Sequence, residues 1–145
     1  MNDFLEHYAQ HLKAVAKANA LNKPIVFDAL AAAGLTLVEV EFDGEGDSGQ
    51  IEGVSAYTGD AIAELPESSL TLQQAAQNKT DLRTTTVILR DAIETLCYDY
   101  LAQTHGGWEN NDGAYGTFKF DVKERSIRLD FNERFTDSTH HSHDF

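Results

Sequence analysis

The segment Gly46-Asp47-Ser48-Gly49 contains the four residues that surround the nucleophilic serine of trypsin-like proteases. A serine nucleophile needs a base within hydrogen-bond reach, and that base needs a group that orients it. In the trypsin-like order the histidine precedes the serine, but only His7 and His11 precede Ser48 in this chain. Histidines that follow Ser48, such as His105, could serve other triads, yet expected strands on both sides of Ser48 differ from the strand-turn-helix context of an elbow nucleophile. The segment therefore favours a turn, because aspartate, serine and glycine all suit tight turns.

Acidic residues around Ser48 could instead bind a divalent cation. Acids spaced two residues apart, from Asp43 to Asp47, match the first ligands of an EF-hand loop. That loop requires glycine at its sixth position and glutamate at its twelfth, where this chain has Ser48 and Val54. A calcium or magnesium site of another kind, which would include Glu52, stays open as an alternative.

The histidines raise a second metal hypothesis. His7 and His11 lie four residues apart, which places them on one face of a helix, and three more histidines lie near the end of the sequence. Solvated histidines are the simpler interpretation, because His7 is not followed by the glutamate found in zinc proteases. No cofactor is expected, with a divalent metal ion as the alternative. The ligands predicted for such an ion are Asp47, Glu52 and His143.

The segment from Gly106 to Gly116 combines the only tryptophan, Trp108, with a run of amide and acid side chains. The simpler interpretation is structural: Trp108 fills the edge of the core and Asn-Asp-Gly forms a turn. The alternative is a binding loop, in which Trp108 is an aromatic platform and Glu109 and Asn110 supply hydrogen bonds.

The hydrophobic periodicity predicts the elements that must position these residues. Helices are expected at residues 2–20, from Pro24 to Gly34, and from about Asp81 to Gln103. Alternating residues predict two hairpins, with strands at 35–43 and 50–57 and at 118–122 and 127–131. Leu70-Thr71-Leu72 could be a short strand or a docked loop, and the tail from Thr136 is expected to be loose.

The resulting order, ααββαββ, predicts an α+β fold with two layers. In this fold a mostly antiparallel sheet of about four strands, formed by the two hairpins, packs against the helices. The length of 145 residues predicts one domain, 1–145, with an N-terminal helical part at 1–34 and a tail at 136–145.

The charge of the chain is strongly negative. There are 24 acidic and 11 basic residues, for a net charge of -13. The absence of a Lys/Arg cluster argues against direct binding of nucleic acid and against an anionic membrane surface. The start of the sequence lacks the basic and apolar regions of a signal peptide, and no apolar run reaches the ~20 residues of a membrane helix, so a cytoplasmic location is expected. The single cysteine, Cys97, falls on an apolar helical face and is expected to be a buried, inert thiol.

Segments in order along the chain, from residue 35 to the end, resemble a bacterial family of domains of unknown function. They are Phe42-Asp43-Gly44-Glu45-Gly46-Asp47-Ser48-Gly49-Gln50-Ile51-Glu52, Gly107-Trp108-Glu109-Asn110-Asn111-Asp112-Gly113-Ala114-Tyr115-Gly116, Phe131-Asn132-Glu133-Arg134, and a tail with His143-Asp144-Phe145. The resemblance implies no reaction, but it implies that these segments occur together. We therefore expect the first hairpin tip, the tryptophan loop and the tail to converge at one end of the sheet. The predicted binding residues are Asp43, Asp47, Ser48, Glu52, Trp108, Glu109, Asn110 and Tyr115.

Two classes of function fit these features. The first is a non-enzymatic acidic module of a bacterial accessory system, of the mobile-element or phage-related kind, that contacts a basic protein surface. An acidic mimic of DNA would be a special case, since Glu39, Glu41 and Asp43 alternate along one strand. The alternative is a metal-dependent hydrolase with a carboxylate and histidine site. The first class is favoured, with a protein partner and no residue in a catalytic role, because no motif supplies a nucleophile or a complete set of metal ligands.

Overall fold

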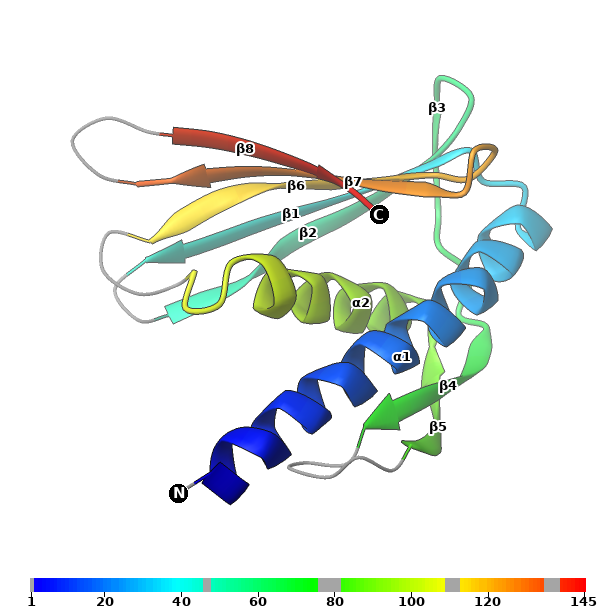
Figure 1. The fold of residues 1–145 in the computed structure, drawn as a ribbon. Coiled ribbons are helices and arrows are strands. Elements are labelled where there is room, and N and C mark those ends of the chain that lie inside the picture. The colour runs from blue at the N-terminus through cyan, green and yellow to red at the C-terminus, as the bar shows by residue number, and fades with distance from the viewer. Residues whose placement is uncertain (1, 46–47, 76–81, 109–112, 135–138) are drawn as a thin grey trace.

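The computed structural model of the chain describes residues 2–45, 48–75, 82–108, 113–134 and 139–145. Its larger sheet contains β1 (Leu37–Glu45), β2 (Ser48–Thr58), β3 (Ala61–Ala63), β6 (Ala114–Asp121), β7 (Ser126–Glu133) and β8 (Thr139–Asp144). These strands are antiparallel and lie in the order β3-β2-β1-β6-β7-β8. The remaining elements are the helices α1 (Asn2–Ala32) and α2 (Leu89–Thr104) and a hairpin of β4 (Ser69–Ala75) and β5 (Leu82–Ile88). Figure 1 shows both helices and the β4–β5 hairpin on one side of the six-stranded sheet.

The predicted four-strand fold with the order ααββαββ is wrong, although the class α+β and both predicted hairpins are present. The described residues form two helices and eight strands, six of them in one sheet and two in the other. The two predicted hairpins become the β1–β2 and β6–β7 pairs, and β1 joins them by pairing with β6. The additional strands come from segments whose expected states were loop, helix and tail.

The first two predicted helices are one continuous helix, α1, with Pro24 in its interior. A break was expected because proline lacks the N–H that would bond to the carbonyl of Ala20. Tertiary contacts on either side of Pro24 outweigh this loss. Asn22 donates its side-chain N–H to the Gln73 carbonyl oxygen and accepts the Gln73 N–H, both at 2.8 Å, while Phe27 is fully buried beneath the sheet.

The segment predicted as the third helix begins as a β-strand. Residues 82–88 form β5, and α2 begins only at Leu89. The sequence Thr84-Thr85-Thr86-Val87-Ile88 is a run of β-branched residues, whose restricted side chains favour extended backbone. Among the described residues no side chain caps α2; instead, the Leu89 N–H donates to the Ser68 carbonyl oxygen at 2.9 Å.

The expected loose tail contains the edge strand β8, which pairs with β7 in an unbroken register from Arg128↔Asp144 to Glu133↔Thr139. Leu70-Thr71-Leu72, for which strand and loop were both open, lies in β4. The tail lacked an apolar alternation because its inward positions hold histidines. His141 and His143 pair with Phe131 and Leu129, which face the helices.

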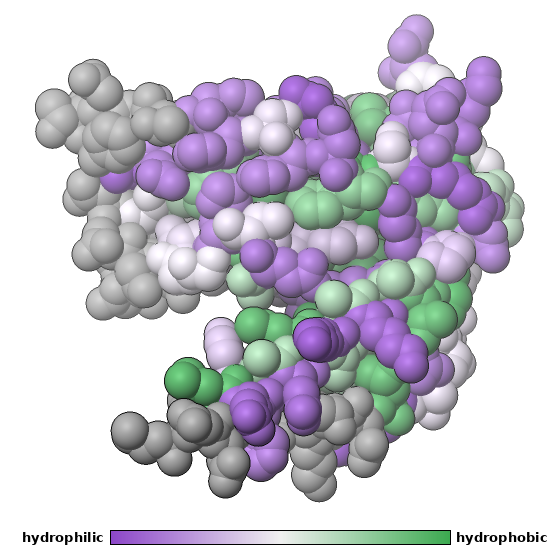
Figure 2. All heavy atoms as spheres, in the orientation of Figure 1, coloured by the Kyte–Doolittle hydropathy of each residue, from purple (hydrophilic) through white to green (hydrophobic). Residues whose placement is uncertain are grey.

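The core lies between the sheet and the helices. One face of β1, β6 and β7 contributes alternating apolar residues that are almost completely buried, and α1 and α2 contribute the other half of the core. Trp108 packs edge-on against Phe42 with the ring centroids 5.4 Å apart, as the structural interpretation of its loop predicted. In the view of Figure 2, hydrophobic residues gather over the layer that contains α1, whereas the sheet above is mainly hydrophilic.

Two asparagines one turn apart in α1 give a matched stability prediction. Asn22→Leu is expected to lower the free energy of unfolding by about 2 kcal/mol, because it leaves the N–H and carbonyl of Gln73 without their partner. Asn19 is 3% exposed, and its side-chain atoms have no hydrogen-bond partner among the residues that the structure describes. Asn19→Leu, which keeps the branched shape, is therefore expected to raise this free energy by about 1 kcal/mol. Urea titrations measure both, and shifts of the same sign would contradict the account.

Candidate functional site

The face of the six-stranded sheet that points away from the helices, here called the outer face, carries its polar residues in rows across the strands. The first row aligns Gln50, Asp43, Tyr115, Asn132 and His140. The next row aligns Glu41, Thr117, Asp130 and Ser142, and the third aligns Ser55, Glu39, Lys119, Arg128 and Asp144. Because side chains alternate along a strand, these positions share one face while the apolar residues between them fill the core.

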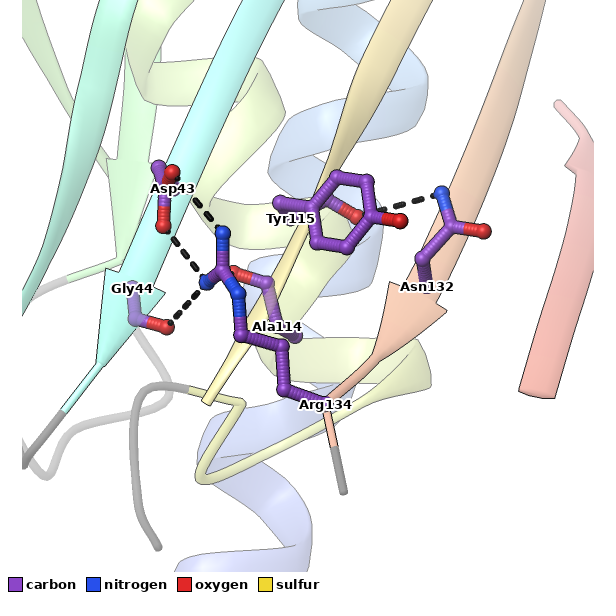
Figure 3. Close-up of polar contacts among 6 residues, drawn as sticks. All are labelled: Asp43, Gly44, Ala114, Tyr115, Asn132 and Arg134. Atoms are coloured by element: carbon purple, nitrogen blue, oxygen red, sulfur yellow. Dashed lines mark hydrogen bonds and ion pairs between the residues drawn. The ribbon is translucent and has the colours of Figure 1, made fainter. Parts of the chain in front are cut away.

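An arginine clamp fixes one end of the outer face (Figure 3). Arg134 donates two hydrogen bonds to the Asp43 carboxylate, at 2.6 and 3.0 Å, and a third to the Gly44 carbonyl oxygen at 3.1 Å. Its guanidinium carbon lies 4.7 Å from the centre of the Tyr115 ring. This bidentate, stacked geometry suits arginine, and it connects the end of β7 to β1 across β6.

A depression of about 360 Å³ lies beside this clamp, and we call it the outer depression. It extends across β2, β1, β6 and β7, and Thr117 and Gly116 place only small groups in its middle. Carboxylates surround these groups: Glu41, Asp43, Glu52 and Asp130 line the outer depression, together with a single base, Lys119. The outer depression is therefore a shallow acidic site with an aromatic ring, Tyr115, at its edge.

A β-bulge brings Glu52 into this site. Glu41 pairs with Gly53 and the next residue of β1, Phe42, pairs with Ile51, so Glu52 is the extra residue of β2. Bulges of this kind redirect a side chain locally. The Ile51 N–H donates to the Tyr98 hydroxyl oxygen of α2 at 2.9 Å, which fixes the bulged strand to the helix layer. The bulge thus sets Glu52 beside Glu41 at the outer depression.

The carboxylates of the outer face differ in how they are neutralised. Asp43 is paired with Arg134, and Asp130 lies 3.4 Å from Arg128 Nε and 3.3 Å from His140 Nε2. Among the residues that the structure describes, Glu41 and Glu52 have no ion-pair partner. These two groups are therefore the acids of the outer depression that are available to a cation from outside.

A protein-family model described as a family of unknown function, DUF6878, matches residues 18–145. The chain belongs to this family. The match covers every strand, α2 and much of α1, and it confirms the expected membership of a family without an assigned function. No curated protein and no solved structure matches the chain.

The structure places three of the predicted binding residues together and one, Trp108, on the opposite side of the sheet. Asp43, Glu52 and Tyr115 all line the outer depression. Trp108 lies on the inner side, where it packs against Phe42. Asp47, Glu109 and Asn110 lie outside the described residues, and for Ser48 the structure describes the backbone position in β2.

The predicted metal ligands are placed apart where the structure describes them. Glu52 belongs to the outer depression, whereas His143 points to the inner side, and Asp47 is outside the described residues. The Nε2 atoms of His143 and His105 are 2.8 Å apart, a distance at which one ring donates to the other. Burial, followed by the positive charge that His143 and His141 can carry, lowers the pKa of His105. Within the described ranges no group of three or more His, Cys, Asp or Glu residues could hold a metal ion.

Two further expectations bear on chemistry and location. Cys97 is fully buried, as predicted, and burial followed by the charge of Glu94 raises the pKa of its thiol well above the usual value. That the thiol is inert stays a prediction, which the raised pKa favours. Neither described helix has the length and apolar character needed to cross a membrane.

Sequence reasoning did not select Arg134, Lys119 or Asp130 as residues of a candidate site. Their position depends on which strands are neighbours, and the pairing of β1 with β6 joins residues far apart in the sequence. The alternation in β6 and β7 did indicate that Lys119 and Asp130 point away from the core. It gave no signal for the Asp43–Arg134 pair, which spans two strands.

Proposed function

We propose that the chain is a non-enzymatic binding module whose outer face holds a basic segment of a protein partner. The observation that carries this proposal is the pair of glutamates, Glu41 and Glu52, which line a depression on the open face of the sheet and lack ion-pair partners within the described residues. The sheet fixes the backbone positions of both residues, so the binding of a cation has to order only their side chains.

The intramolecular clamp supports the kind of group that would bind. Asp43 and Tyr115 already receive a guanidinium group, from Arg134, through a bidentate ion pair and a cation–π contact. Glu41 and Glu52 lie in the same depression and offer the same chemistry to a second cationic side chain. The net charge of -13 would accelerate the approach of a basic partner.

Charge reversal at the outer depression tests this function. With a synthetic arginine-serine repeat peptide as the probe, Glu41→Lys/Glu52→Lys is expected to lower the affinity at least about tenfold, because both available acids become bases. Isothermal titration calorimetry at about 0.05 M salt measures the affinity, which should weaken at about 0.2 M salt.

The matched control changes the net charge equally at the other end of the sheet. Asp60 and Glu124 are exposed residues in the turns that follow β2 and β6. Asp60→Lys/Glu124→Lys is expected to change the affinity by less than about threefold. If both double variants weaken binding equally, the peptide responds to net charge alone and the outer depression is not the binding site.

A further inference from the structure

A second pocket lies in the helix layer, on the opposite side of the sheet from the outer face. It has a volume of about 400 Å³ and is lined by α1, α2 and both strands of the β4–β5 hairpin. Figure 1 shows these four elements below the six-stranded sheet. Small-molecule pockets in proteins begin at roughly 300 Å³, so the space is large enough for a compact organic ligand. We call it the helix-layer pocket.

The walls of the helix-layer pocket are of two kinds. Val15 of α1, Leu72 of β4 and Val87 of β5 supply apolar surface from three different elements. Asp99 of α2 and His11 of α1 supply ionisable groups, and neither lysine nor arginine is among the described residues that line the pocket. A ligand that fits must therefore combine an apolar body with a group that satisfies a carboxylate.

Asp99 is partly buried, and this burial raises the pKa of its carboxyl from 3.8 to about 6, with an opposing effect from His11. A partly buried carboxylate has lost part of its hydration, so its charge is less favourable than in water unless a cation compensates it. Near neutral pH the carboxyl of Asp99 still ionises and carries this cost. A negative charge at Asp99, placed on the wall of a pocket, is consistent with a role in binding a cationic ligand.

We propose that the helix-layer pocket binds an alkylammonium group, with the Asp99 carboxylate as its counter-charge and Val15, Leu72 and Val87 along its alkyl chain. A free amine and the side chain of a lysine share this chemistry. The proposal is independent of the outer face, because none of the residues that it uses lines the outer depression.

The affinity should depend on pH. Binding needs Asp99 ionised, so it is expected to weaken as the pH falls through about 6. Among the residues that the structure describes, the titratable groups that interact with Asp99 are His11 of α1 and Tyr100 of α2, and the hairpin residues that line the pocket are uncharged.

The test uses the full chain, with n-pentylamine as the probe and n-pentanol as its neutral analogue. Binding of each compound is monitored by the NMR signals of the Asp99 carboxyl carbon and of the backbone amides. The amine is expected to give saturable shifts around Asp99 at about pH 7.5, and pentanol to bind at least about tenfold more weakly. Asp99→Asn should lower the affinity for the amine at least about tenfold, whereas Asp91→Asn, at an exposed position of the same helix, should leave it unchanged.

A glycine peptide that contains one lysine is tested beside the free amine. The comparison distinguishes a free amine from a lysine side chain as the source of the ammonium group. Binding of the amine alone supports a small-molecule ligand, and binding of both supports a lysine of a protein. Equal binding of pentanol and pentylamine, or an Asp99→Asn variant that binds the amine as well as the wild type, would overturn the proposal. Failure here would leave the effect of Glu41→Lys/Glu52→Lys on the arginine-serine peptide untouched.

Discussion

Gly116→Ala is expected to lower the free energy of unfolding by about 3 kcal/mol, one of the largest effects of any single substitution in the sheet. An added Cβ would lie 2.8 Å from Cζ of Phe42 and even closer to the Asp130 carbonyl oxygen. The oxygen belongs to the backbone of β7, so relief requires β6 and β7 to move apart. The same movement would widen the outer depression, which Gly116 and Asp130 both line.

A second glycine of the same sheet is the control for this prediction. A Cβ added at Gly53 of β2 would meet no heavy atom within 4 Å. Gly53→Ala is therefore expected to change the free energy of unfolding by less than about 0.5 kcal/mol. Urea denaturation of the wild type and both variants measures the difference, and equal midpoints for the two variants would refute the close approach of β6 and β7.

Asp99→Asn is expected to raise the free energy of unfolding by about 3 kcal/mol at about pH 7.5 and to leave it nearly unchanged at about pH 4. The pKa of Asp99 is about 6 in the folded protein and 3.8 in the unfolded chain, so folding favours the protonated carboxyl. This favourable contribution is full below the unfolded pKa and is lost as the pH rises through about 6. Asparagine stays neutral at every pH, so the variant does not lose this stability as the pH rises.

Asp91→Asn is the matched control, since Asp91 is exposed in the first turn of α2. The substitution removes a favourable negative charge near the helix N-terminus, so the free energy of unfolding is expected to fall by about 0.5 kcal/mol. Thermal or urea denaturation at both pH values measures the two variants. An Asp99→Asn variant that is no more stable than the wild type at about pH 7.5 would show that Asp99 is well solvated.

The hairpins were predictable from the sequence because β1, β6 and β7 each have a strict alternation of apolar and polar residues, whereas the alternation in β2 is weaker and is interrupted by the bulge at Glu52. Phe118, Phe120, Ile127 and Leu129 are fully buried, as their spacing predicted. Periodicity could not predict β8, because its inward positions are histidines. It also assigned residues 82–88 to a helix, although the β-branched run there favoured a strand.

The site was only partly predictable for a similar reason. Asp43, Glu52 and Tyr115 were selected from motifs, and the structure brings them together in the outer depression. The helix-layer pocket was not foreseen, because its walls come from four elements and one of them, β5, was expected to be helical. Local patterns indicate which side chains face the core, whereas a site depends on which elements are neighbours.

The central claim is that the outer depression holds a basic segment, and mapping of the bound peptide on the full chain tests it most directly. Adding the arginine-serine peptide to ¹⁵N-labelled protein is expected to shift the amide signals around Glu41, Glu52 and Thr117, and to leave those of α1 and the β4–β5 hairpin unchanged. Shifts centred on the helix layer, or spread evenly over the acidic residues of the whole surface, would contradict the account.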